Sequence, residues 1–341
     1  MKFLKKIAVN KVSLEASTAC QLRCPVCPTS QGKTSKNICG TGFLRLENFK
    51  RFLNLNKSIK EIELANWGEV FLNPHLSKIF EYAYQQNVNM TITTGANLNH
   101  VTEECLEALV KYRVKELVVA LDGASNETYS IYRIGGSFDK VIENVKTINQ
   151  LKQKYNSNSP KLIWQYVVFG HNENDIIKAK QLAKNLNMEF RAKLNVVPNY
   201  SPIHNTEKVL KDANINSVKT EDDWGIVMCN QLWESPQINW DGNILGCCHN
   251  NWATFGGNVF EKNLDECLNS EPMIYAREML MGHVPAREDI PCTTCEFFEI
   301  RLRNKKWLNM YTIKRSRIAE KYPFIRNLFQ IFKRLVLFKR Y

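Results

Sequence analysis

The stretch Val12-Ser-Leu-Glu-Ala-Ser-Thr-Ala-Cys20-Gln-Leu-Arg-Cys24-Pro-Val-Cys27 places three cysteines directly behind a predicted β-strand at 12–16. Three thiolates at this spacing in one loop can bind three irons of a four-iron cluster and leave the fourth iron without a protein ligand. Catalytic metal sites keep such an open position for a small molecule, whereas electron-transfer clusters usually have four protein ligands. The spacing alone leaves two alternatives open, a zinc site that lacks a ligand and three unrelated thiols.

Outward from this stretch, residues 12–195 alternate short β-branched runs with longer helical patterns. The predicted strands lie at 12–16, 61–65, 89–93, 116–121, 162–168 and 190–194, with helices near 46–55, 75–87, 101–112, 138–154 and 173–186. Six strands joined by five helices predict a parallel sheet with crossover helices, either an open barrel or a doubly wound sheet. In both folds the active site lies at the carboxyl ends of the strands, which is where the cysteines fall.

Length, charge and cysteine content restrict the class of protein. The chain has 341 residues, enough for one large domain and a smaller one. It shows no secretory signal, so its eleven cysteines, grouped as CxxxCxxC and CxxC, indicate metal binding in a reducing cytoplasm rather than disulfides. The net charge is +12, but residues 312–341 hold nine Lys/Arg and one acid. The rest of the chain is close to balanced, and we expect no nucleic-acid partner.

The C-terminal segment 312–341 has the pattern of a basic amphipathic helix. Six apolar residues share one helical face, and the Lys/Arg lie mostly off it; they are Ile325, Leu328, Phe329, Phe332, Leu335 and Val336. Its longest apolar run, 335–338, is too short to span a bilayer. Such a helix can lie on an anionic membrane surface, or it can cover the barrel or a partner. We therefore expect a cytoplasmic protein, with peripheral membrane contact through 318–341 as one of two alternatives.

Further polar motifs follow the next predicted strands. After the second strand comes Trp67-Gly68-Glu69-Val70. A small residue here lets a ligand approach the backbone, and the acid beside it can accept hydrogen bonds from an ammonium group. The third strand leads into Thr94-Gly95-Ala96-Asn97, and the fourth into Asp122-Gly123 and then Tyr132-Arg133. The parallel-sheet prediction places all of these turns on the same rim as the cysteines.

Taken in this order, the motifs over residues 12–300 resemble the radical S-adenosylmethionine (SAM) enzymes. The resemblance implies that Cys20, Cys24 and Cys27 bind a [4Fe-4S] cluster whose open iron is chelated by SAM. Reduction of the cluster then cleaves SAM to a 5′-deoxyadenosyl radical, which abstracts a substrate hydrogen. It also implies that Gly68 and Glu69 contact the SAM amino group, and it leaves Asn97 and Arg133 as further candidate SAM contacts.

Three positions depart from the pattern of that family. Trp67 and Val70 replace the first Gly and the Pro of a Gly-Gly-Glu-Pro motif. Val26 stands where the residue before the third cysteine is often aromatic, and Ala120 stands where a Ser is frequent. None of these departures removes an iron ligand.

A second set of cysteines, Cys229, Cys247, Cys292 and Cys295, resembles the SPASM-type domain that many of these enzymes append. The fuller form of that domain has further cysteines and holds two clusters. None follows Cys295 here, so we expect one auxiliary [4Fe-4S] cluster, and four ligands make a closed site suited to electron transfer. A structural zinc held by the same four cysteines is the alternative. Cys248 could replace Cys247 as ligand. The run 239–247 contains Asp-Gly and predicts a β-hairpin.

The sequence thus predicts an α/β protein with a partial (β/α)6 TIM-like barrel at 12–197, an auxiliary-cluster domain at 226–300 and a basic tail helix at 312–341. A polar segment, 198–225, links the first two. The predicted function is a radical SAM enzyme that acts on a peptide or on a small molecule such as a sugar derivative. Its expected partner is a low-potential electron donor such as flavodoxin or ferredoxin. The competing class is a non-catalytic zinc- or cluster-binding scaffold with a membrane-surface tail.

Overall fold

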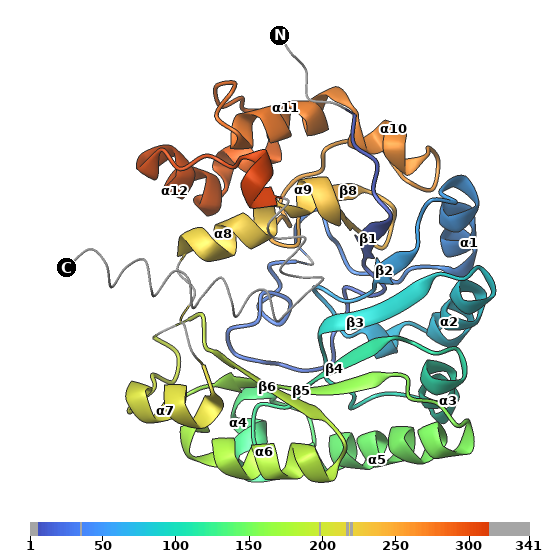
Figure 1. Cartoon of the computed structure of the whole chain (residues 1–341), viewed down its shortest axis with the longest axis vertical. Coiled ribbons are helices and arrows are strands. Elements are labelled where there is room, and N and C mark those ends of the chain that lie inside the picture. The colour runs from blue at the N-terminus through green and yellow to red at the C-terminus, as the bar shows by residue number, and fades with distance from the viewer. Residues whose placement is uncertain (1–5, 35, 198, 216–217, 219–220, 314–341) are drawn as a thin grey trace.

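The structure, a computed structural model, describes residues 6–34, 36–197, 199–215, 218 and 221–313 (Figure 1). The predicted tail helix lies outside the described residues apart from its first two positions, 312 and 313. Within the described part of the chain, every helix is too short or too polar to cross a bilayer.

Six parallel strands form the central sheet. They are β1 (Lys11–Leu14), β2 (Glu61–Glu63), β3 (Asn89–Ala96), β4 (Glu116–Ala120), β5 (Lys161–Val168) and β6 (Glu189–Leu194). In the sheet their order is β6-β5-β4-β3-β2-β1, without a reversal. A doubly wound sheet reverses its strand order at an internal strand, so this order is that of a barrel. The predicted partial (β/α)6 barrel is confirmed, and it is open because β6 lies at the edge of the sheet.

Five helices connect the strands and cover the outer face of the sheet (Figure 1). They are α1 (Leu46–Leu55), α2 (Leu76–Gln85), α3 (Glu103–Lys111), α5 (Phe138–Lys154) and α6 (Ile176–Asn185), with a short helix α4 (Asn126–Tyr132) before α5. Each turns one apolar face inward; on α5 that face contains the buried Val141, Val145 and Ile148. Strand β4 is buried along its apolar run, as expected for a parallel strand covered on both faces.

The segment between the barrel and the second cysteine set is more ordered than its polar composition predicted. The predicted link, 198–225, contains α7 (Thr206–Ala213) and the first residues of α8 (Glu221–Cys229). The Asn205 side chain accepts a hydrogen bond from the Lys208 N–H and caps α7, and Val209 and Ala213 are buried. Two apolar residues on one face and a capping residue were enough to form a helix in a stretch predicted to be only a link.

The C-terminal part contains α9 (Gln231–Glu234), β7 (Gln237–Ile238), β8 (Ile244–Gly246), α10 (Leu264–Leu268), α11 (Glu271–Leu280) and α12 (Glu296–Asn304), with short 3-10 turns at η1 (Val70–Leu72), η2 (Glu173–Asp175) and η3 (Pro291–Thr294). Strands β7 and β8 are antiparallel and confirm the predicted hairpin. Strand β7 also pairs in parallel with β1, Ser13 opposite Gln237. The hairpin therefore extends the barrel sheet next to the strand that precedes the first cysteines.

Candidate functional site

The first three cysteines lie in the loop that follows β1, at the carboxyl edge of the sheet. Cys24 is buried, and Cys20 and Cys27 are partly exposed. The Cys27 N–H donates to the Cys24 carbonyl at 3.2 Å, so the last four residues of the motif form a turn. Burial raises the pKa of the Cys20 thiol to about 11, and the neighbouring thiols of Cys24 and Cys27 add to the rise. The three thiols thus lie close enough together for each added negative charge to act on its neighbours.

Gly68 is needed for the packing of two loops. The next residue, Glu69, donates its N–H to the Ala19 carbonyl at 2.8 Å, just before Cys20. A Cβ atom added to Gly68 would lie 2.2 Å from the Ser17 carbonyl oxygen and 2.6 Å from that of Ala19. In the structure the backbone of the cysteine loop lies against this glycine. The contact of Gly68 with SAM stays a prediction.

Glu69 and Asn97 join the second and third strand ends to the cysteines. The Glu69 carboxylate is 2% exposed and accepts hydrogen bonds from the N–H groups of Asn97, at 2.6 Å, and Phe71, at 3.3 Å. Burial raises the pKa of Glu69 to about 7, and these N–H groups oppose the rise. The Asn97 side chain also donates to the Cys20 sulfur at 3.8 Å. Asn97 therefore links the Glu69 carboxylate, which can accept hydrogen bonds from a cation, to the Cys20 thiol.

Arg133 reaches the same loop from the fourth strand end. Its Nε and Nη2 donate to one carboxylate oxygen of the fully buried Asp122, at 2.7 and 2.6 Å. The remaining nitrogen, Nη1, donates to the Cys24 sulfur at 3.8 Å. Burial raises the pKa of Cys24, and the Arg133 charge opposes that rise. All four sequence-predicted SAM candidates thus lie around the three cysteines.

The second set of cysteines converges from four separate elements. Cys229 ends α8, Cys247 follows β8, Cys292 lies in η3 and Cys295 caps α12. Burial raises the pKa of Cys292 well above its ordinary value, and the thiols of Cys247, Cys229 and Cys295 add to that rise.

The backbone of Cys248 is already engaged elsewhere. Its N–H donates to the Gln231 side chain at 2.6 Å, and its carbonyl accepts from Asn66 at 3.0 Å. These are backbone contacts, and the Cys248 thiol lies beside Cys247 and Cys229. Cys247 as the fourth ligand stays a prediction.

The family models decide what these two groups belong to. Residues 14–183 match the model of the radical SAM superfamily, and residues 229–296 match that of SPASM, an iron-sulfur cluster-binding domain. The chain belongs to the radical SAM superfamily. Its radical SAM domain binds a [4Fe-4S] cluster and SAM, and its SPASM domain binds iron–sulfur. The chain is therefore an enzyme rather than a non-catalytic scaffold.

Solved structures with the same fold include radical SAM enzymes. SuiB of Streptococcus suis, solved with its precursor peptide SuiA, has a TM-score of 0.59 at 15% identity, over 87% of this chain and 71% of that chain. The enzyme anSMEcpe with bound AdoMet has a TM-score of 0.58 at 15% identity, over 85% and 87%. BtrN with AdoMet and 2-DOIA has a TM-score of 0.50 at 15% identity, over 86% and 94%. No curated protein sequence matches the chain.

The residues of this radical SAM enzyme fit the groups that its domains bind. Cysteine thiolates are the usual ligands of iron–sulfur clusters, and the first site adds Arg133 and Asn97 as donors to sulfur. Within the described residues, no three His, Cys, Asp or Glu side chains are close enough together to hold a single metal ion. Cys39, Cys105 and Cys267 are buried and belong to neither cysteine group.

Sequence reasoning missed two acidic residues of the site, Glu15 and Asp122. Glu15 is 1% exposed, and burial raises its pKa to about 8. Its carboxylate accepts the N–H groups of Asn66 and Trp67 at 3.2–3.3 Å, and so supports the loop that carries Gly68 and Glu69. The sequence feature that could have revealed Glu15 is an acid between the apolar residues Leu14 and Ala16 at the end of β1. The sequence placed Asp122 directly after the fourth predicted strand without giving it a role. The structure shows that its carboxylate binds the Arg133 guanidinium.

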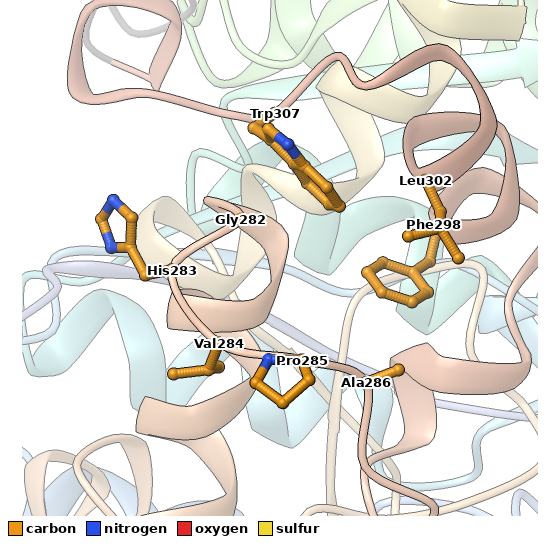
Figure 2. Close-up of a pocket in the computed structure, with 8 residues that line it drawn as sticks. All are labelled: Gly282, His283, Val284, Pro285, Ala286, Phe298, Leu302 and Trp307. Carbon is orange, nitrogen blue, oxygen red and sulfur yellow. The ribbon is translucent and has the colours of Figure 1, made fainter.

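A hollow of about 300 Å³ lies elsewhere, in the C-terminal part of the enzyme. It is lined by residues 282–286, Phe298, Leu302 and Trp307 (Figure 2). None of these residues belongs to either cysteine group or to the predicted SAM contacts. We therefore place the candidate active site at the strand ends rather than in this hollow.

Proposed function

We propose that this radical SAM enzyme cleaves SAM at a [4Fe-4S] cluster held by Cys20, Cys24 and Cys27. The radical produced would abstract hydrogen from a peptide or from a small molecule such as a sugar derivative. The observation that carries the proposal is the junction of the two loops: the Glu69 N–H is bonded to Ala19, and its buried carboxylate lies beside the Cys20 thiol. A SAM molecule on the open iron would have its ammonium group within reach of this acid.

When bound, the cluster supplies the electron that breaks the sulfonium bond of SAM. The residues of the chain bind and orient. Glu69 would accept hydrogen bonds from the SAM ammonium group, which stabilises the ionised carboxylate despite its burial. Arg133 would offset the negative charge of the thiolates through Nη1, because Asp122 fixes its other two donors. Asn97 would hold both Glu69 and Cys20 in place.

We further propose that Cys229, Cys247, Cys292 and Cys295 hold one auxiliary [4Fe-4S] cluster. Four ligands close the site to substrate, so its role in this proposal is to accept or relay an electron after hydrogen abstraction. The corresponding division of the chain is a barrel at 12–197, an auxiliary domain at 226–300 and a tail at 312–341.

The substrate class stays broad in this proposal. SuiB was solved with a precursor peptide, and BtrN with 2-DOIA. Both enzymes share the fold at about 15% identity, which supports a common chemistry and leaves the substrate pocket of this chain to experiment. A low-potential donor such as flavodoxin or ferredoxin would reduce the first cluster. We propose a cytoplasmic location, with the tail at 318–341 contacting anionic membrane.

The deciding experiment is anaerobic incubation of the reconstituted enzyme with SAM and dithionite, followed by an assay of 5′-deoxyadenosine. We expect product from the wild type and none when Cys20, Cys24 and Cys27 are all changed to Ala. Failure of the fully iron-loaded wild type to form 5′-deoxyadenosine would overturn the proposal. A panel of peptides and small sugars, screened for faster SAM consumption, then separates the two substrate classes.

A further inference from the structure

A buried arginine in α12 has donors without an oxygen or nitrogen acceptor. Arg301 is 5% exposed, and its Nη1 donates to the Lys306 carbonyl at 3.4 Å. Its Nε and Nη2 are buried and donate to no oxygen or nitrogen among the described residues. Burying a charged donor without an acceptor is costly, so a buried guanidinium normally faces a carboxylate or another anion. These two donors therefore indicate an anionic group beside Arg301.

The surroundings of Arg301 show which group that is. Helix α12 begins directly after Cys295 and packs against α8, which ends at Cys229. Residues 225 and 229 lie one helical turn apart and share a face of α8. A Cβ atom added to Gly225 would be 3.2 Å from Phe297 and 3.4 Å from the Arg301 Nη2, so the guanidinium lies against α8 at this residue.

The charge of Arg301 acts on a cysteine of the second group. Burial raises the pKa of the Cys229 thiol, and the Arg301 guanidinium opposes that rise through its charge and a side-chain hydrogen bond. Arg301 therefore lies directly beside one of the four proposed ligands.

The first site contains a contrasting arginine. Arg133 also lies beside a cysteine, but Asp122 occupies two of its nitrogens and offsets its charge. Arg301 has no carboxylate partner in the described structure. No hydrogen-bonded carboxylate of the described residues therefore offsets its positive charge beside the second cysteine group.

We propose that Arg301 is a positioning residue of the auxiliary cluster, whose charge and buried donors raise the reduction potential of that cluster. This inference rests on the proposed function, because it requires a cluster on Cys229, Cys247, Cys292 and Cys295. Reduction adds negative charge to a cluster, and a nearby cation or hydrogen bonds to its sulfurs stabilise the reduced form more than the oxidised form. The low dielectric of a buried site strengthens the effect.

The test is an anaerobic redox titration of the auxiliary cluster, followed by electron paramagnetic resonance in the reconstituted full-length enzyme. Arg301→Met removes the charge at similar length, Arg301→Gln keeps donors without charge, and Arg301→Lys keeps the charge with a different donor geometry. Arg303→Met is the matched control, because Arg303 lies on the same helix and is exposed. The iron content of every variant is measured first.

In the Met and Gln variants we expect the ratio of reduced to oxidised auxiliary cluster to fall about tenfold when measured at the same solution potential. That corresponds to a potential about 59 mV lower for one electron. The Lys variant should lie between them and the wild type, and Arg303→Met should match the wild type. Loss of the second cluster from Arg301→Met, with retention in Arg301→Lys, also supports the role.

An unchanged potential in a fully loaded Met or Gln variant would overturn the inference and leave the proposed function intact. A wild-type enzyme with iron in its first site only would overturn the auxiliary-cluster proposal and this inference together. The iron count therefore tests the auxiliary-cluster proposal, and the reduction potential tests the role of Arg301.

Discussion

The two cysteine groups are assembled in different ways. The first takes three cysteines from one short loop behind β1 and surrounds them with Glu69, Asn97 and Arg133 from three other strand ends. The second takes its cysteines from four elements spread over residues 229–295 and has one buried arginine beside them. A loop with three thiols leaves room for a ligand, and the polar groups around it can bind that ligand. A site closed from four directions can hold a cluster without exposing it to substrate.

Removing either cysteine group tests this comparison with the largest effect. With Cys20, Cys24 and Cys27 changed to Ala, we expect iron to fall from about eight atoms to about four and 5′-deoxyadenosine formation to stop. With Cys292 and Cys295 changed to Ala, iron should fall by a similar amount while SAM cleavage persists. Cys105→Ala, a buried thiol in α3, should change neither. Zinc in place of iron at the second site would contradict the auxiliary-cluster proposal alone.

Gly68→Ala should damage the first site and spare the second. The added Cβ would meet backbone oxygens of the cysteine loop at 2.2–2.6 Å, so one of the two loops must move. We expect at least a tenfold weaker affinity for SAM and a lower occupancy of the first cluster, measured by equilibrium binding and by iron content. Equal SAM affinity in Gly68→Ala and the wild type would show that this packing does not matter for binding.

Glu69→Ala should weaken SAM binding without removing iron, because it deletes an acceptor for the ammonium group and no iron ligand. A charge-assisted hydrogen bond is worth about 1.5–3 kcal/mol, so the Kd should rise about tenfold or more. Isothermal titration under anaerobic conditions measures it. Glu61→Gln, at the opposite end of β2 and paired with Lys11 and Lys115, should bind SAM normally. An unaltered Kd in Glu69→Ala would show that this loop does not bind SAM.

Glu15→Gln should alter the pH dependence of stability rather than the chemistry. Burial raises the folded-state pKa of Glu15 from 4.5 to about 8. Between these values the folded state binds more protons than the unfolded state, so wild-type stability falls as pH rises through this window, by at most about 1.4 kcal/mol per pH unit. The variant lacks this titration, and its melting temperature relative to the wild type should rise between pH 6 and pH 8. A difference that does not change with pH would contradict the raised pKa.

Deleting residues 318–341 should have the smallest effect on either site. We expect both clusters and SAM cleavage to remain, and binding to anionic vesicles to weaken, because basic residues near such a surface contribute on the order of 1 kcal/mol each. Binding of the full chain should fall as salt rises. Loss of clusters from the truncated protein would show instead that the tail packs on the folded enzyme.

Much of this site could be predicted from local sequence. Cys20, Cys24 and Cys27 lie close together in any loop conformation, because so few residues separate them. Asn97 and Arg133 were placed at the correct rim because the carboxyl ends of parallel strands meet at one edge. Glu15 was missed because a single acid directly after a strand does not reveal whether it binds a ligand or supports a loop. Arg301 was missed because its neighbour Cys229 is 72 positions away and no local pattern connects them.

The sequence by itself determined the alternation of strands and helices, the hairpin with its Asp-Gly turn and the three-thiol loop, since each depends on contacts within a few residues. Only the tertiary structure decided between a barrel and a doubly wound sheet, because both have the same order of elements along the chain and differ in which strands pair. It also brought α8, β8, η3 and α12 together around the second cysteine group. These outcomes depend on contacts between distant segments, which form when buried surfaces pack and which local residue patterns do not specify.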